Sequence, residues 1–277
     1  MAETGETCMR LNFVFATLLL AAPAAAQPAD TMGELAPAVE LALNRGALLY
    51  MYDAAAWHGT DDLRDHFAQL MPLVDGYVVS GDQASVELVF YDKDASKAVY
   101  RARYSYEKLV SSGPPTADRV ALTSVEQRLV AARGTAIKAF ELANVSVCAK
   151  ATPNIALLAP NNPAEPVRAY LMTPRTSIKS LPMGGHYEVD ITVDGNAGPV
   201  RAFTKSCLEL SLAGDGKGKP AALVMSHLLD PTPTEIHVFS SLTGRMPLYV
   251  ITTSNKKTWV IEGSRIRLLP DQQTAKK

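Results

Sequence analysis

The C-terminal half of the chain places the strongest constraint on the fold. From Val145 to Leu269, short segments rich in β-branched and aromatic residues are separated by turns that contain Pro, Gly or Asn. Many short strands at nearly regular spacing are typical of an antiparallel sandwich or a partly open barrel. We therefore predict an antiparallel β domain over residues 145–270, with 221–229 and 235–242 among its strands.

The region 27–144 has a different pattern. Apolar residues recur at three- and four-residue steps over 33–58, which predicts a helix with one buried stripe. A glycine and a threonine at positions 59 and 60 predict a break, with Thr60 capping a second short helix. The helices and the strands that follow them make this a helical and meander region, which is either a separate domain or the helical cover of a sheet that it shares with the β domain.

Alternating segments over 76–105 predict a small three-stranded meander. A further helix is predicted over 124–143, where Thr123 and Glu126 have the spacing of a capping box. The predicted fold class is therefore α+β: N-terminal helices with a small β-meander, followed by a larger antiparallel β-sandwich or partly open barrel. We expect a disordered tail over 271–277.

The first 26 residues are unlike the rest of the chain. Arg10 precedes an apolar stretch that ends in three alanines, the small side chains that a signal peptidase recognises. The stretch is too short to serve as a membrane-spanning anchor. We predict a signal peptide with translation starting at Met9, cleavage near Ala26-Gln27 and a mature protein that is periplasmic or secreted.

Cysteine usage agrees with export. Cys8 leaves with the leader, and Cys148 and Cys207 remain. In an oxidising compartment an even pair usually forms a disulfide, which would stabilise the fold by roughly 4 kcal/mol in the chain-entropy model. We predict this bond, with Cα atoms within about 7 Å of each other; two separate buried thiols are the alternative.

The charge balance argues against nucleic-acid binding. The chain has 27 basic and 28 acidic residues, and removal of the leader takes away one arginine and two glutamates, leaving 26 of each. Without a basic surplus there is no electrostatic attraction to phosphate backbones. No segment after the leader approaches about 18 continuous apolar residues, so we expect no transmembrane anchor in the mature chain.

One stretch of the β domain combines two histidines with two carboxylates. It is SHLLDPTPTEIHVF, residues 226–239. We predict a hairpin whose turn is 230–234, which places His227 opposite His237 on one face of the ladder. Glu235 shares that face.

Two interpretations of this hairpin stay open. In one, zinc is held by two imidazoles and a carboxylate, given one further ligand, and the protein is a metal-assisted hydrolase. In the other, the face is half solvated, tolerates histidine and binds no metal, and no cofactor is predicted. The candidate metal ligands are His227, Glu235, His237 and Asp230.

A second cluster lies near the predicted helix break. His58, Asp62 and His66 follow one another at four-residue intervals. His58 can join the other two only if the helix is continuous, and an Asp62–His66 pair is an ordinary i,i+4 contact. Aromatic residues on the same helix could instead line the pocket of a small-molecule carrier: Tyr50, Tyr52 and Trp57.

Nucleophile motifs such as G-x-S-x-G and H-E-x-x-H are absent from the sequence. At YMYDAAAWHGTDD and PTEIHVFSSL the chain resembles a group of secreted alphaproteobacterial proteins of unknown function. The resemblance implies export and a compact globular fold, and it carries over no catalytic residue. We expect an exported, non-enzymatic protein that binds an envelope component or a protein partner through its β domain.

Overall fold

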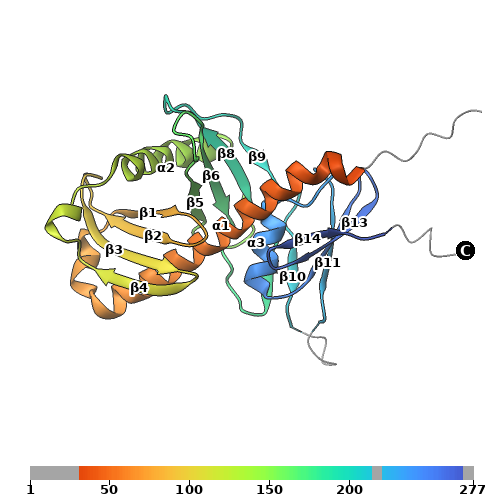
Figure 1. Ribbon diagram of the computed structural model, residues 1–277, viewed down its shortest axis with the longest axis horizontal. Coiled ribbons are helices and arrows are strands. Elements are labelled where there is room, and N and C mark those ends of the chain that lie inside the picture. The colour runs from red at the N-terminus through yellow and green to blue at the C-terminus, as the bar shows by residue number, and fades with distance from the viewer. Residues whose placement is uncertain (1–30, 214–219, 271–277) are drawn as a thin grey trace, which may run out of the picture.

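The structure is a computed structural model, which describes residues 31–213 and 220–270 (Figure 1). The predicted signal peptide and the predicted tail over 271–277 lie outside the described residues. The helices are α1 (Thr31–His66), η1 (Ala68–Leu73), η2 (Ala117–Arg119), α2 (Ser124–Leu142) and α3 (Glu235–Gly244). Among these, no helix is long and apolar enough to cross a membrane within the described ranges.

The strands are short, as the turn spacing predicted. In the first half they are β1 (Gly76–Gly81), β2 (Val86–Tyr91), β3 (Ala98–Ser105) and β4 (Lys108–Gly113). The second half contains β5 (Asn154–Leu158), β6 (Val167–Met172), β7 (Ser180–Pro182), β8 (Tyr187–Ile191), β9 (Arg201–Ala202), β10 (Glu209–Ser211), β11 (Leu223–His227), β12 (Leu248–Thr252), β13 (Lys257–Glu262) and β14 (Arg265–Leu268).

These strands form four sheets in the described residues. The orders are β1-β2-β3-β4, β5-β6-β8-β9, the ribbon β7-β10, and β11-β12-β13-β14. All pairings are antiparallel except β11 with β12, which are parallel and joined through α3. The α+β class with mostly antiparallel sheets is confirmed, and the predicted meander has a fourth strand, β4.

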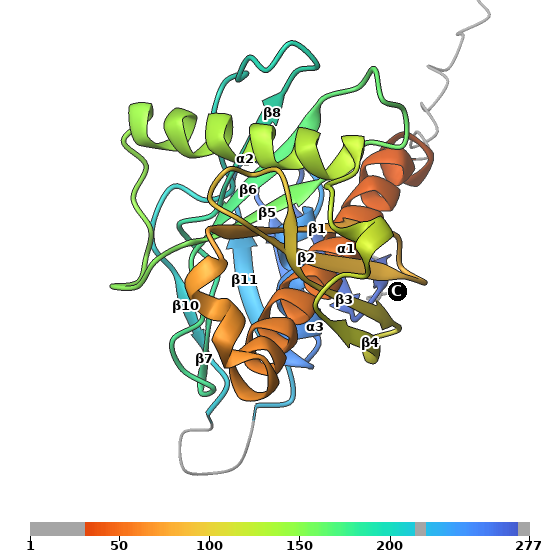
Figure 2. The same ribbon diagram turned by 90° about the vertical axis from the view of Figure 1, so that its left-hand side faces the viewer.

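Three apolar cores hold the sheets together. α1 runs obliquely across the molecule between the β1–β4 sheet and the β11–β14 sheet, and α2 covers the β5-β6-β8 sheet (Figures 1 and 2). One core lies between α1 and the β1–β4 sheet, and a second lies between α2, the other face of that sheet and the β5-β6-β8 strands. A third surrounds Trp259 in the β11–β14 sheet. α1 contributes to the first and the third core, so it ties the two ends of the molecule together.

The predicted break in the first helix is wrong, because α1 is continuous through Gly59 and Thr60. Thr60 does not cap a second helix; its hydroxyl donates to the Ala56 carbonyl 2.7 Å away within the same helix. Gly59 is a packing position, since a Cβ there would collide with the Leu88 side chain. Gly46 has the same role against α3, where an added Cβ would lie 2.5 Å from the Val238 Cβ.

The predicted strand 235–242 is also wrong, because these residues form α3. Thr234 caps the helix, and His237 occupies the third helical position of a capping box. Every residue from Glu235 to Ser241 is buried, so the segment has no polar face to reveal a helical period. The predicted 226–239 hairpin is therefore a strand-loop-helix connection, in which the turn of 230–234 leads into α3.

The disulfide prediction is confirmed. Cys148 and Cys207 are joined, with Cα atoms 5.4 Å apart. Gly185, at a positive φ of 72°, passes so close that an added Cβ would lie 2.7 Å from the Cys148 sulfur. The bond links the segment between α2 and β5 to the segment between β9 and β10. The predicted capping box of Thr123 and Glu126 at the start of α2 is present as well.

Candidate functional site

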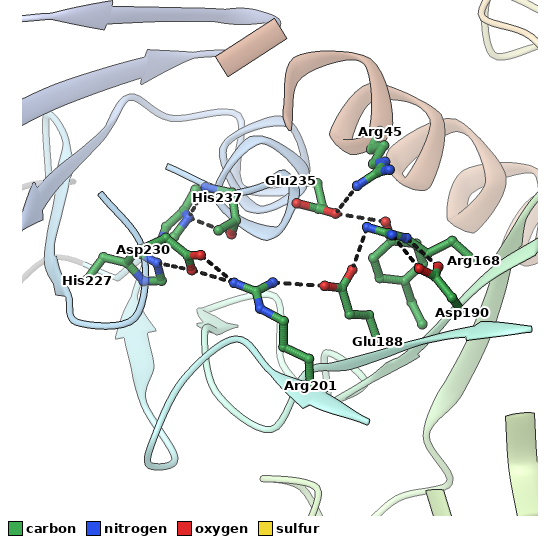
Figure 3. A network of polar contacts seen from close by, with 11 residues as sticks. Arg45, Arg168, Glu188, Asp190, Arg201, His227, Asp230, Glu235 and His237 are labelled. Atoms are coloured by element: carbon green, nitrogen blue, oxygen red, sulfur yellow. Dashed lines mark hydrogen bonds and ion pairs between the residues drawn. The ribbon is translucent and has the colours of Figure 1, made fainter. Parts of the chain in front are cut away.

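A continuous group of polar side chains crosses the middle of the molecule, where α1, the β5-β6-β8-β9 sheet and the β11–α3 connection meet (Figure 3). We call this group the polar seam. It contains all four residues of the predicted hairpin site. Its members are Arg45 on α1, Arg168 and Tyr170 on β6, Glu188 and Asp190 on β8, Arg201 on β9, and His227, Asp230, Thr234, Glu235 and His237 in the β11–α3 connection.

Arg201 joins the two halves of the seam. One of its Nη atoms donates to the Glu188 carboxylate at 2.9 Å. The other donates to both oxygens of Asp230 at 2.6 Å. Its guanidinium also lies 5.0 Å from the centre of the Phe203 ring, a cation–π contact. A planar guanidinium suits this geometry because its donors diverge toward two carboxylates at once.

Arg168 completes the ion pairs on the sheet side. It donates to both Asp190 oxygens at 2.8 and 2.7 Å, and to Glu188 at 3.2 Å. Glu188 thus lies between two guanidinium groups. Such pairing offsets the free energy that burial of a carboxylate costs.

Glu235 is the first residue of α3 and lies next to α1. The Tyr170 hydroxyl donates to its carboxylate at 2.8 Å, and Arg45 is 3.7 Å away. Burial raises the pKa of Glu235, and repulsion from the neighbouring Glu188 adds to the shift. The Glu235 carboxylate oxygen that contacts Tyr170 also faces Arg45 (Figure 3).

The two histidines do lie together. Their rings meet edge to face, with centroids 4.7 Å apart. The His227 Nε2 donates to the Asp230 carboxylate at 2.8 Å, and His237 Nδ1 accepts from the Thr234 backbone N–H at 2.9 Å. Burial lowers the pKa of His237 to about 3, and the neighbouring His227 contributes to the shift. His237 is therefore neutral at ordinary pH, with its proton on Nε2.

The prediction that this face is half solvated is wrong. His227 is 1% exposed and His237 is 2% exposed, so neither ring is open to a substrate. In the parts of the chain that the structure describes, no group of three or more His, Cys, Asp and Glu side chains is arranged to hold a metal ion. Each charged member of the seam instead contacts another member. These contacts join α1, the β5-β6-β8-β9 sheet and the β11–α3 connection.

The second predicted cluster connects α1 to the β1–β4 sheet. Asp62 accepts from the Tyr100 hydroxyl at 2.6 Å and lies 3.0 Å from the His66 Nδ1. Burial acts to raise the pKa of Asp62, but these hydrogen bonds outweigh it and the pKa is lowered. His58 is exposed and stacks on Trp57 with ring centroids 5.3 Å apart, so the continuous helix does not bring it into the cluster.

The three aromatic residues of α1 have different environments. Tyr52 is buried and its hydroxyl donates to the Gly81 carbonyl, Tyr50 donates to Glu107, and Trp57 is 66% exposed. The pocket beside Tyr52 has a volume of about 20 Å³, room for roughly one water molecule. It is too small for the ligand of a small-molecule carrier.

Sequence reasoning missed the arginines and acids of the sheet side. A signal existed: Arg168 and Tyr170 alternate on one strand, as Glu188 and Asp190 do on another. In the sheet, Arg168 pairs with Asp190 and Tyr170 with Glu188. That signal becomes specific only when the register of the two strands is known.

The opposite side of β11 forms an open sheet edge. Leu223 donates its N–H to the Pro247 carbonyl, and the His227 carbonyl accepts from Thr253. In a parallel pair the backbone groups of alternate residues point to the same side, so those of Val224 and Ser226 point away from β12. No other strand pairs with this side of β11 within residues 31–213 and 220–270.

Two apolar side chains along this edge are accessible. Val224 is 59% exposed and Leu228 is 57% exposed. Tyr249 and Ile251 of β12 lie beside Val224 and Ser226 in the register of the sheet and extend the same face. We call the outer backbone groups of β11, with Val224, Ser226 and Leu228, the β11 edge.

No protein-family model, curated protein or solved structure matches the chain.

Proposed function

We propose that the protein is an exported, non-enzymatic binding protein whose β11 edge accepts an extended segment of another envelope protein as an additional strand. The observation that carries the proposal is the uncharged β11 edge, whose outer backbone groups no strand of the described residues pairs with and whose exposed side chains include Val224 and Leu228. Strand addition uses these two features: main-chain hydrogen bonds provide affinity, and alternate side chains provide specificity.

Two other edge strands of the described residues, β4 and β14, carry features that oppose such pairing. β4 begins with Lys108, and its ladder with β3 is interrupted by a bulge between Arg103 and Tyr104. β14 carries Arg265 and Arg267. Charged residues and bulges are the usual means by which proteins block edge pairing. β11 has neither, and this contrast favours β11 over β4 and β14 as the binding edge.

The edge also favours one class of segment. From Ala221 to Leu229 the only ionisable side chain is His227, which points inward and is buried. A charged segment would lose solvation on this surface and gain no counter-charge. We therefore expect a segment with apolar residues at alternate positions, which would pack against Val224 and Leu228.

Two further observations support an exported, non-enzymatic role. The apolar leader ending in three alanines is typical of a signal peptide, and a disulfide between Cys148 and Cys207 suits an oxidising compartment. In the polar seam, both histidines are buried and hydrogen-bonded, so they are poorly placed for proton transfer to a substrate.

Photo-crosslinking tests the proposal. A photoreactive amino acid replaces Val224 in the full-length chain, which is expressed with its own leader, and crosslinked products are identified by mass spectrometry. Val110 of β4, which is 51% exposed on a protected edge, is the matched control position. We expect one other envelope protein to crosslink through an extended segment at position 224 and not at 110. Equal products at both positions, or a crosslink only between two copies of this chain, would contradict the proposal.

A further inference from the structure

Asp53 of α1 is paired differently from five other buried or partly buried acids. Its one hydrogen bond in the described residues is from the Asn154 side-chain amide, at 3.3 Å, and it has no ion pair there. The others each contact an arginine, or a histidine together with a tyrosine. These acids are Asp62, Glu126, Glu188, Asp230 and Glu235.

Asp53 lines a partly enclosed pocket at the junction of α1, β1 and β5. Tyr77, Asn154 and Tyr52 contribute the other polar side chains of its wall, and apolar residues form the rest. The volume of about 20 Å³ accommodates roughly one water-sized group. The pocket therefore has the size of a single ammonium group, with acceptor oxygens on its wall.

The electrostatics of the pocket favour a positive charge. Burial raises the pKa of Asp53, and only the hydrogen bond from Asn154 opposes the shift. Arg133 lies close by, but its guanidinium is 5.2 Å from the centre of the Tyr77 ring and donates to the Ile155 carbonyl at 3.1 Å. A partly desolvated carboxylate without a cation costs free energy that a bound cation would recover.

Trp57 supplies a second feature next to Asp53. It lies four residues further along α1, on the same side of the helix, and the residue is 66% exposed, with its ring stacked against His58. Exposed tryptophan is a favourable surface for cations and for the methylene groups that carry them. An alkyl chain leaving the pocket could therefore lie along the indole ring.

We propose that the Asp53 pocket binds a primary alkylammonium group, with the ammonium beside the Asp53 carboxylate and the alkyl chain against Trp57. Two sources share this chemistry: a lysine side chain of another protein, and a free alkylamine. The pocket is too small for a quaternary ammonium group. This inference is independent of the function proposed for the β11 edge, because it uses other residues in another part of the fold.

The test is a titration of the purified mature protein, followed by the indole N–H signals in nitrogen-15-labelled samples. The chain has two tryptophans, and buried Trp259, which donates to Thr252, is an internal reference. The probes are n-butylammonium, Nα-acetyl-lysine amide and tetramethylammonium. We expect the first two to shift the Trp57 signal with millimolar affinity, and tetramethylammonium to leave it unchanged.

Two variants isolate the carboxylate. Asp53→Asn preserves the shape of the side chain and should weaken binding of n-butylammonium by about tenfold or more, the loss of one favourable charge interaction. Asp65→Asn removes an exposed acid of the same helix and should leave binding unchanged. Tighter binding of the lysine amide would assign the site to a protein side chain, and tighter binding of n-butylammonium to a free amine. Equal binding to wild type and Asp53→Asn, equal shifts by tetramethylammonium, or no shift at all would overturn the proposal.

Discussion

The two sides of β11 differ in how their polar groups are satisfied. On the inner side, His227 joins a seam in which arginines, acids and a tyrosine contact one another in the interior. On the outer side, the backbone groups of Val224 and Ser226 have no strand to pair with in the described part of the chain. A satisfied interior network stabilises a fold, whereas an unpaired, uncharged edge is available to another chain. The two histidines of the predicted hairpin therefore belong to the structural side of β11, and the proposed binding surface lies on its other side.

A fall in pH should cause the largest loss in the free energy of unfolding, and it should act through buried histidines. Burial lowers the pKa of His237 to about 3, and it lowers the pKa of His186, a buried residue directly before β8, to about 4. In the unfolded chain these histidines take up protons near pH 6.5. The stability that depends on their neutral form is therefore fully present above that pH, and it is lost as the pH falls toward their pKa values in the folded protein. Each histidine contributes about 1.4 kcal/mol per pH unit, or about 5 kcal/mol for both between about pH 6 and about pH 4. Glu235, with its raised pKa, works in the opposite direction and offsets part of the loss.

Chemical denaturation across this pH range measures the effect. His237→Asn should reduce the slope of unfolding free energy against pH, because the asparagine oxygen can accept from the Thr234 N–H without binding a proton. His58→Asn, at an exposed position, is the control and should leave the slope as in wild type. An unchanged slope in His237→Asn would show that the inner side is less closed than the structure indicates.

Removing Arg201 should have the next largest effect. Arg201→Leu leaves Glu188 with Arg168 as its partner and Asp230 with His227. We expect the free energy of unfolding to fall by about 2 kcal/mol, less than for a fully buried pair, because the Arg201 side chain is partly exposed. Arg267→Leu breaks the exposed pair with Glu262 and should cost less than about 0.5 kcal/mol. Thermal unfolding of both variants makes the comparison. Equal losses would mean that the seam contributes no more than an ordinary surface ion pair.

Substitutions on the outer side should have the smallest effect on stability. Val224→Lys and Val110→Lys each place a charge at an exposed position, and each should change the free energy of unfolding by less than about 0.5 kcal/mol. Only Val224→Lys should abolish capture of the partner, since a lysine on the edge opposes strand addition. If both variants still capture the partner, Val224 does not lie at the contact.

The sequence predicted the parts of the fold that depend on local pattern. The α+β class, the Thr123 capping box and the Cys148–Cys207 bond all follow from residue type and spacing. The errors arose where tertiary contacts override local preference. Gly59 indicates a helix break in isolation, but within the fold it allows α1 to approach Leu88.

The candidate site shows the same limit. His227 and His237 were expected to be neighbours across a hairpin, and they are neighbours across a strand-loop-helix connection instead. The α3 segment is buried on every side, so its sequence has no period that separates a helix from a buried strand. The openness of the β11 edge depends on strand order, which a single sequence does not specify.

The most direct measurement of the proposed binding mode separates the backbone of β11 from its side chains. Ser226→Pro removes an N–H that points to the open edge and makes no hydrogen bond to β12, whereas Ser226→Ala keeps that N–H and loses only the hydroxyl. Both variants are compared with wild type for capture of the envelope protein that crosslinks at position 224. We predict that Ser226→Ala binds as wild type does and that Ser226→Pro, still folded, does not bind. Full binding by folded Ser226→Pro would contradict strand addition at β11.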